Sequence, residues 1–276
     1  MYLLGAVAPR LQPKSRFVIV TAGRSGSELL TDLLNSHPAI VCDAEILHER
    51  QAMPERFVAG RAAKAGLGGA QAYGFKIHCG HFGYQFIREH PGYLSQMSKS
   101  GAHLIWLRRE DLLAQAISST VANHTRWHWR EDDHASFEAP EVDPVEVLMM
   151  TYLFEESDAF LGRLVAGLPH LTLVYERDLL DGTRQQATVH RICAHLGVEE
   201  APTRSDHVRY TPSALPDTVK NWDAVAELIG STRFGRFVDT GAGAGAGKVR
   251  NGVGNGAGGG DRPAPTTESE PTVPSA

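Results

Sequence analysis

The stretch RFVIVTAGRSGSELLTDLL, residues 16–34, decides the fold. Its first part, Phe17 to Val20, is a short apolar run rich in β-branched residues, which predicts a buried strand. Leucines then recur at helical spacing from Leu29 to Leu34, which predicts a helix. A turn of small residues, 21–27, joins the two, so a strand, a turn and a helix follow one another without a gap.

This turn has the features of an anion-binding site. Gly23 and Gly26 let the backbone come close to a ligand, and the amides at the start of the following helix point toward it. Arg24 adds a fixed positive charge and a bidentate fork that suits phosphate or sulfate oxygens. An ordinary strand-to-helix turn is the alternative, because a glycine-containing loop alone is a weak signal.

The spacing in the turn does not match the loop of nucleotide triphosphatases, which needs Gly, four residues, Gly-Lys and then Ser or Thr. Here two residues separate Gly23 from Gly26, and Glu28 follows Ser27. Residues 24–27 instead resemble the phosphosulfate-binding loop of sulfotransferases that use 3′-phosphoadenosine 5′-phosphosulfate (PAPS). The resemblance implies that Arg24 stabilises the leaving phosphate during catalysis. The residues that it assigns to donor binding here are Gly23, Arg24, Ser25, Gly26 and Ser27.

A second motif resembles the part of these sulfotransferases that binds the 3′-phosphate of the donor. The family uses an Arg at the end of a strand and a Ser on the following helix. In this chain a predicted strand, residues 103–107, ends in Arg108, and Ser118 lies on the predicted helix that follows. The spacing leaves Arg109 open as an alternative to Arg108, and Ser119 as an alternative to Ser118. A further alternative is that the arginines are solvated and the serines are ordinary surface residues.

Two residues are candidates for the general base that takes the acceptor's proton. Glu45 matches a Glu at the acceptor pocket of bacterial sulfotransferases similar to the trehalose and nodulation-factor enzymes. His78 ends a Lys-x-His run, residues 76–78, within the predicted strand 73–79. The run is similar to that of cytosolic animal sulfotransferases, where the His is the base. A Glu titrates near 4.3 and a His near 6.5, so intrinsic basicity favours His78. The closer resemblance favours Glu45, which we prefer; a solvated Glu and a structural His are the alternatives.

Two further residues rest on weaker resemblances. Tyr175 lies near the end of the predicted strand 171–176 and would line the adenosine site, although a core tyrosine is the equal alternative. Lys220 lies in a segment weakly similar to the one that closes over the donor, but the glycine-rich part of that motif is missing.

Composition limits the class of protein. The chain has 276 residues, 42% hydrophobic and 21% charged, and a formal charge of −5, which argues against nucleic-acid binding. Cys42, Cys79 and Cys193 are too far apart to suggest a disulfide framework or a zinc site, and no metal is expected. The start lacks a basic leader and a long apolar run, so we expect neither a signal peptide nor a membrane span. We expect a cytoplasmic location.

The order of elements predicts the fold class. Strands that alternate with helices indicate an α/β protein, here a P-loop-like three-layer α/β/α fold with a central parallel sheet over residues 1–240. Residues 241–276 are rich in Gly, Ala and Pro and are predicted to be a disordered tail. Other expected features are a strand at 40–42, a helix within 48–72, an exposed insertion at 120–143, a long helix at 144–166 and a helix ended by Gly197.

The sequence therefore predicts a PAPS-dependent sulfotransferase that acts on a hydroxyl of a small molecule, carbohydrate or glycolipid. Two alternatives stay open: a nucleotide kinase or triphosphatase with a degenerate loop, and a non-catalytic nucleotide-binding relative. The sequence does not decide the oligomeric state, for which a homodimer is one option.

Overall fold

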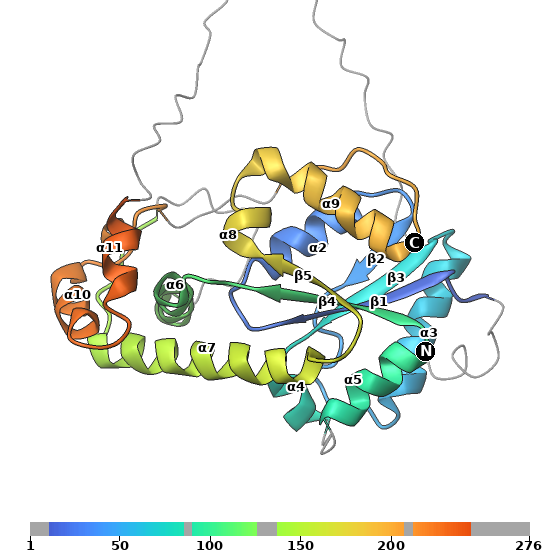
Figure 1. Cartoon of the computed structure of the whole chain (residues 1–276), viewed down its shortest axis with the longest axis horizontal. Coiled ribbons are helices and arrows are strands. Elements are labelled where there is room, and N and C mark those ends of the chain that lie inside the picture. The colour runs from blue at the N-terminus through green and yellow to red at the C-terminus, as the bar shows by residue number, and fades with distance from the viewer. Residues whose placement is uncertain (1–10, 86–89, 126–136, 207–211, 244–276) are drawn as a thin grey trace, which may run out of the picture. The chain divides into compact units, whose positions relative to one another are not determined.

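A central sheet of five parallel strands organises the chain in a computed structural model, which describes residues 11–85, 90–125, 137–206 and 212–243 (Figure 1). The strand order is β2-β3-β1-β4-β5, so the strand of the opening motif lies in the middle. The strands are β1 Ser15–Thr21, β2 Ile40–Asp43, β3 Ala72–Ile77, β4 Ala102–Arg108 and β5 His170–Val174.

Helices cover both faces of this sheet. In Figure 1, α2, α8 and α9 lie on one face, and α4, α5 and α7 lie on the other. The described helices are α2 Ser27–Asn35, α3 Pro54–Leu67, α4 Cys79–Tyr84, α5 His90–Lys99, α6 Leu112–Thr125, α7 Pro144–Val165, α8 Tyr175–Asp178, α9 Gly182–Leu196, α10 Trp222–Gly230 and α11 Arg236–Gly243, with a short 3-10 helix at Leu215–Asp217. The predicted three-layer α/β/α fold with a parallel sheet is confirmed.

The alternation of side chains along β1 builds two separate cores. Phe17 and Ile19 pack toward α2 and α9, whereas Val18 and Val20 pack toward the helices of the opposite face. All four side chains are at most 1% exposed, as expected for a central strand covered on both sides.

Two strands end earlier than the sequence predicted, because the next residues start helices. β3 ends at Ile77, and His78 caps α4 by accepting a hydrogen bond from the Gly80 amide at 3.1 Å. β5 ends at Val174, and Tyr175 is already the first residue of α8. Both residues therefore lie just past the carboxyl edge of the sheet rather than inside a strand.

The expected insertion at 120–143 is wrong at both ends. At one end, the first residues continue α6 to Thr125. At the other end, Val142 is 3% exposed, and its backbone N–H and C=O form hydrogen bonds with the side-chain amide of Asn221. The middle, residues 126–136, lies outside the described residues.

The other expected elements are confirmed, including the long helix as α7 and the end of α9 at Gly197, which has φ +66°. Cys42 and Cys193 are buried, whereas Cys79 is half-buried. α11 reaches Gly243, and the rest of the predicted tail lies outside the described residues. No helix in the part of the chain that the structure describes is long and apolar enough to cross a bilayer.

Candidate functional site

The turn after β1 has an unusual backbone. Arg24 has φ +60°, and it is the one non-glycine residue with positive φ in the described ranges. Gly26, with φ +82°, is the N-cap residue of α2. A side chain in the left-handed region is disfavoured, and such residues cluster at ligand sites. The strain at Arg24 therefore supports a functional role for this turn.

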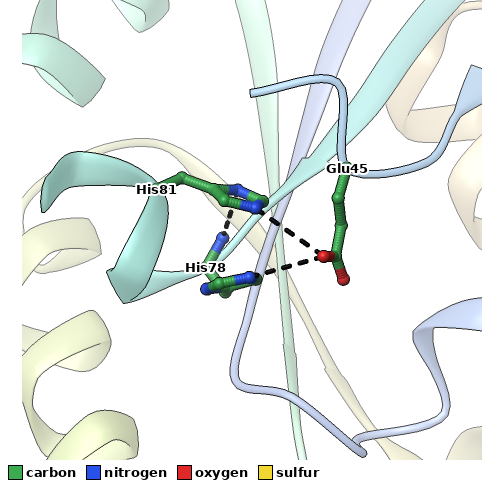
Figure 2. Close-up of side chains that lie close together, drawn as sticks. All are labelled: Glu45, His78 and His81. Atoms are coloured by element: carbon green, nitrogen blue, oxygen red, sulfur yellow. Dashed lines mark hydrogen bonds and ion pairs between the residues drawn. The ribbon is translucent and has the colours of Figure 1, made fainter. Parts of the chain in front are cut away.

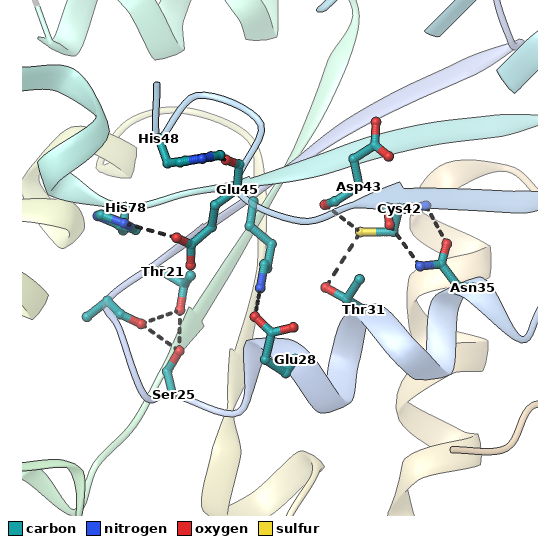
Figure 3. Close-up of polar contacts among 12 residues, drawn as sticks. Thr21, Ser25, Glu28, Thr31, Asn35, Cys42, Asp43, Glu45, His48 and His78 are labelled. Atoms are coloured by element: carbon teal, nitrogen blue, oxygen red, sulfur yellow. Dashed lines mark hydrogen bonds and ion pairs between the residues drawn. The ribbon is translucent and has the colours of Figure 1, made fainter. Parts of the chain in front are cut away.

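Ser25 organises the turn from inside. Its hydroxyl is fully buried, donates to the Ala22 main-chain oxygen at 2.8 Å and contacts the Thr21 hydroxyl (Figure 3). Ser25 was predicted to bind the donor, but in this structure its one O–H donates inward, so the hydroxyl has no second proton to donate to an anion. Only its backbone amide remains for binding.

Helix α6 holds the turn from the side. Arg24 donates through Nε to Ser118 Oγ at 3.2 Å, and Gln115 donates through Nε2 to the Gly23 main-chain oxygen at 2.6 Å. Of the two candidate serines, Ser118 is thus the one that contacts the turn. Gln115 was missed by the sequence analysis, because a glutamine inside a helix has no signal of its own.

Arg109 reaches the same turn from the end of β4. Its Nη1 donates to the Arg24 main-chain oxygen at 3.2 Å, and its guanidinium lies 4.9 Å from the centre of the Tyr175 ring. Glu176 forms an ion pair with Arg109 at 3.4 Å. The Tyr175 ring also covers Gly26, since a Cβ there would lie 2.3 Å from Tyr175 Cδ2. Tyr175 thus supports both the turn and Arg109; its role toward adenosine stays a prediction.

Arg108 points elsewhere but lines a cavity together with Arg109. Arg108 pairs with Asp158 of α7 at 2.5 Å and lies 5.0 Å from the centre of the Trp106 ring. The cavity has a volume of about 400 Å³. Its lining includes Arg108, Arg109, Glu110, Asp158, Arg236 and Phe237. The structure therefore brings Arg109 to the turn, whereas the sequence analysis preferred Arg108.

The electrostatics of the turn favour an anion. Burial and then the charge of Arg109 lower the pKa of Arg24, so the two like charges destabilise each other. A negative group between them would remove this repulsion and form charge-assisted hydrogen bonds.

Lys76 is buried next to the start of α2. Its ammonium is 1% exposed and pairs with Glu28, in the first turn of that helix (Figure 3 shows the Glu28 side chain). The carboxylate is half-exposed, so this ion pair connects a buried charge to the surface beside the turn. In the sequence, Lys76 stands out only as part of the run that ends in His78.

Glu45 and His78 come together on the other side of the turn (Figure 2). Glu45 follows β2 and His78 follows β3, and Glu45 Oε2 lies 3.4 Å from His78 Nε2. The His81 ring of α4 also faces this carboxylate, with its Nε2 3.7 Å from the same oxygen. Contacts with His78 and then His81 hold the pKa of Glu45 well below its usual range. The two bases that the sequence analysis weighed against each other are partners.

The two imidazoles titrate differently. Burial disfavours the charged form of His78, but contacts with Cys79 and Glu45 outweigh it and raise the pKa of His78 to about 9. Burial lowers the pKa of His81, whose side chain is 0% exposed. His81 was missed by the sequence analysis, because nothing in the sequence distinguishes it from the other histidines.

These three residues have the side-chain types of a metal site, with donor atoms within 4.8 Å of one another. The sequence predicted no such cluster. However, the Nδ1 atoms of His78 and His81 accept backbone N–H groups, from Gly80 at 3.1 Å and from His78 at 3.3 Å. A histidine that binds metal through Nε2 carries its proton on Nδ1 and donates it. The hydrogen bonding of these rings therefore does not fit a metal.

Lys220, the remaining candidate, pairs with Glu138 at 2.8 Å. Its backbone amide donates to the Pro140 main-chain oxygen at 2.9 Å. These contacts connect the segment before α10 to the one before α7, and they do not involve the turn.

The likeness that comparisons with known proteins add is weak. A scan against protein-family models and a search of curated proteins find no match to this chain. Among solved structures, a sulfotransferase from Alicyclobacillus acidocaldarius matches with 16% sequence identity and a TM-score of 0.44. The match covers 83% of this chain and 93% of that chain. Values this low assign no activity, so the chemistry below rests on the residues of this chain.

Proposed function

We propose that this protein transfers a sulfuryl group from PAPS to an acceptor hydroxyl. The observation that carries the proposal is the order of groups along the carboxyl edge of the sheet. The turn with Arg24 follows the central strand, Arg109 follows β4 on one side, and the pair of Glu45 and His78 follows β2 and β3 on the other. Ligands of open α/β sheets bind at this edge. A phosphosulfate in the middle would thus have a cation on one side and a proton acceptor on the other.

The residues around the turn fit the donor. Gly23 is exposed, and within the described ranges no atom lies within 4 Å of the position that its Cβ would take, so a phosphate can approach the backbone. Arg24 and the amides of residues 25–27 would bind the phosphosulfate. Arg109 and Ser118 would bind the 3′-phosphate, and Arg109 shares the wall of a cavity with Arg108.

Glu45 suits the role of proton acceptor better than His78. In its neutral form His78 has one lone pair, on Nδ1, and this accepts the Gly80 amide. In its protonated form the ring has none. An ionised Glu45 keeps lone pairs on both oxygens. His78 then holds the carboxylate in place rather than taking the proton itself.

The chemistry asks mainly for positioning and charge stabilisation. In sulfuryl transfer the acceptor oxygen forms a bond to sulfur, and the bond from sulfur to the bridging phosphate oxygen breaks. Arg24 would stabilise the charge that grows on that leaving oxygen, and Glu45 would take the hydroxyl proton. By analogy with phosphoryl transfer, where the transition state is loose, a carboxylate of low pKa can serve when it orients the hydroxyl and receives the proton late.

The acceptor that we propose is a small molecule, carbohydrate or glycolipid. The test has two arms. In calorimetric titrations, we expect 3′,5′-adenosine bisphosphate (PAP), the product left by the donor, to bind more tightly than ATP with Mg²⁺. Preference for ATP would instead support a kinase or triphosphatase. Transfer of radiolabelled sulfate to a panel of sugars, glycolipids and phenols tests catalysis.

Arg24→Ala is the decisive variant for catalysis. We expect it to lose transfer by at least about 100-fold with an unchanged circular dichroism spectrum. Wild-type rates in this variant would exclude the proposed mechanism. Binding of PAP without transfer to any acceptor would favour the non-catalytic alternative.

A further inference from the structure

We propose that His81 is a positioning residue for the proton acceptor: its ring, held in one tautomer by the backbone, directs an N–H at Glu45 and fixes that carboxylate for the acceptor. The proposal rests on the proposed function, and it adds a residue for which the sequence motifs provide no role.

The tautomer of His81 follows from the start of α4. The His78 backbone N–H donates to His81 Nδ1 at 3.3 Å, and a nitrogen that accepts a hydrogen bond carries no proton. A neutral ring then has its proton on Nε2. This atom lies 3.7 Å from Glu45 Oε2, which is within ion-pair distance but long for a hydrogen bond. Catalytic contacts of this kind often tighten only when substrate binds.

His78 repeats the arrangement one turn earlier. Its Nδ1 accepts the Gly80 amide at 3.1 Å, so its Nε2 proton also faces Glu45 Oε2, at 3.4 Å. The two rings lie close together, with centroids 3.7 Å apart and planes tilted by 35° (Figure 2). Both of these imidazole contacts thus go to the same carboxylate oxygen, Oε2. This arrangement leaves Oε1 to accept from a substrate hydroxyl.

Burial gives the two rings different tasks. The His81 side chain is 0% exposed, whereas that of His78 is 25% exposed. Burial disfavours a charge on His81, so this ring serves as a neutral donor to Glu45. The more exposed His78 can take up a proton, and its Nδ1 then no longer accepts the Gly80 amide. The other charged or titratable groups that act on the cluster are Lys76, His48 and Cys79.

Nitrogen NMR of the full chain reads the tautomer without any need for activity. In long-range proton–nitrogen spectra at pH 10, where both rings are neutral, we expect His78 and His81 in the Nε2–H form. Assignments come from the His78→Asn and His81→Asn variants. An Nδ1–H form of His81 would overturn the proposal, because Nε2 would then have no proton to direct at Glu45.

Two variants of His81 separate positioning from packing. In His81→Asn the amide oxygen can replace Nδ1 as acceptor for the His78 backbone, but nothing replaces Nε2. In His81→Gln the amide nitrogen can replace Nε2 as donor to Glu45. We expect the pKa of Glu45, read by carboxyl ¹³C NMR and assigned with Glu45→Gln, to rise toward its ordinary value in the Asn variant and to return toward wild type in the Gln variant.

The kinetic expectation follows the same order. His81→Asn should lower kcat about 10-fold with little change in KM for the donor, and His81→Gln should recover most of the loss. Equal pKa values for Glu45 in all three proteins would overturn the proposal. If the protein transfers no sulfate, the proposed function fails, while the tautomer and the pKa of Glu45 still report on His81.

Discussion

Arg109 donates a hydrogen bond to the main-chain oxygen of Arg24 across 3.2 Å, although 85 residues separate them in the chain. The contact joins the end of β4 to the turn after β1, so two cations lie side by side in the middle of the sheet edge. Substituting Arg109 therefore tests whether this pair binds the donor. We expect Arg109→Gln to weaken PAP binding by about 10- to 100-fold, since hydrogen bonds to charged groups contribute about 1.5–3 kcal/mol.

Arg177→Gln is the matched control for Arg109. Arg177 lies nearby on α8, is 63% exposed and pairs with Glu110 at 3.8 Å. Its loss should change the dissociation constant of PAP by less than about twofold, since exposed ion pairs contribute little. The affinities for PAP are measured by calorimetry at one ionic strength. An equal loss of PAP affinity in both variants would mean that Arg109 acts only through its contribution to the net charge.

Ser118 and Ser119 form a second matched pair, since both are half-buried neighbours on α6. Ser118→Ala removes the acceptor of the Arg24 Nε hydrogen bond, and Ser119→Ala leaves that bond intact. We expect PAP binding to weaken about 5- to 10-fold in the first variant and to stay unchanged in the second. A larger loss at Ser119 would show that the other serine faces the donor.

Substitution by alanine should destabilise the protein at Gly26 but not at Gly23. At Gly26 the new Cβ would lie 2.3 Å from the Tyr175 ring at φ +82°, so we expect Gly26→Ala to lower the free energy of unfolding by about 1–3 kcal/mol. Gly23→Ala meets no atom within 4 Å among the described residues, and its stability should stay within about 0.5 kcal/mol.

Urea titrations give the stabilities of the two glycine variants, and calorimetry gives their affinities for PAP. If the backbone at Gly23 faces the donor, its alanine variant binds PAP more weakly while it remains stable. Unchanged PAP affinity in Gly23→Ala would count against close approach of a phosphate to this residue.

Removing Glu28 or Lys76 from their ion pair should lower the stability of the protein by different amounts. Glu28→Gln leaves an ammonium that is 1% exposed without its carboxylate, whereas Lys76→Met leaves a Glu28 side chain that is 48% exposed to water. Removing one partner of a buried charge is costly, so we expect Glu28→Gln to destabilise the protein by about 2–3 kcal/mol and Lys76→Met by less. Urea titrations at pH 7 measure both, and the reverse order would contradict the expected burial of the charge.

The stability that Glu45 and His78 contribute should have a maximum in pH. The lowered pKa of Glu45 stabilises the fold above the ordinary value of 4.5, and this contribution is lost as the pH falls below that value. The pKa of His78, raised from 6.5 to about 9, stabilises the fold below pH 6.5, and this contribution is lost as the pH rises through 9. The difference in unfolding free energy between wild type and Glu45→Gln should therefore be largest between about pH 4.5 and 6.5.

Urea titrations from pH 3 to pH 10 measure this difference. His48→Gln is a useful control, because His48 is exposed and its ring contacts the Glu45 backbone rather than the carboxylate. A difference between wild type and Glu45→Gln that does not change with pH would show that the carboxylate is not coupled to His78.

Much of the site could be predicted from the sequence, because each of its parts is formed by residues that are adjacent in the chain. The turn at 23–27 could be predicted from a strand, two glycines and a helix that are adjacent in the chain. Glu45, His78 and Arg109 could be placed at strand ends for the same reason, and parallel strands bring their carboxyl ends to one edge. What could not be predicted is which neighbour each side chain contacts. The pairing of Arg108 with Asp158 depends on a residue far away in the chain, and the inward turn of Ser25 toward Ala22 depends on the exact backbone of the turn.

The sequence by itself determined the α/β class, the parallel strands and the position of the turn, since hydrophobic periodicity and turn residues act over a few neighbours. Only the tertiary structure decided that Arg109 rather than Arg108 meets the turn, that Glu45 and His78 are partners, and that His81 joins them. These contacts depend on strand order and on the direction of each side chain. Both are set by packing between distant segments, which no local pattern encodes.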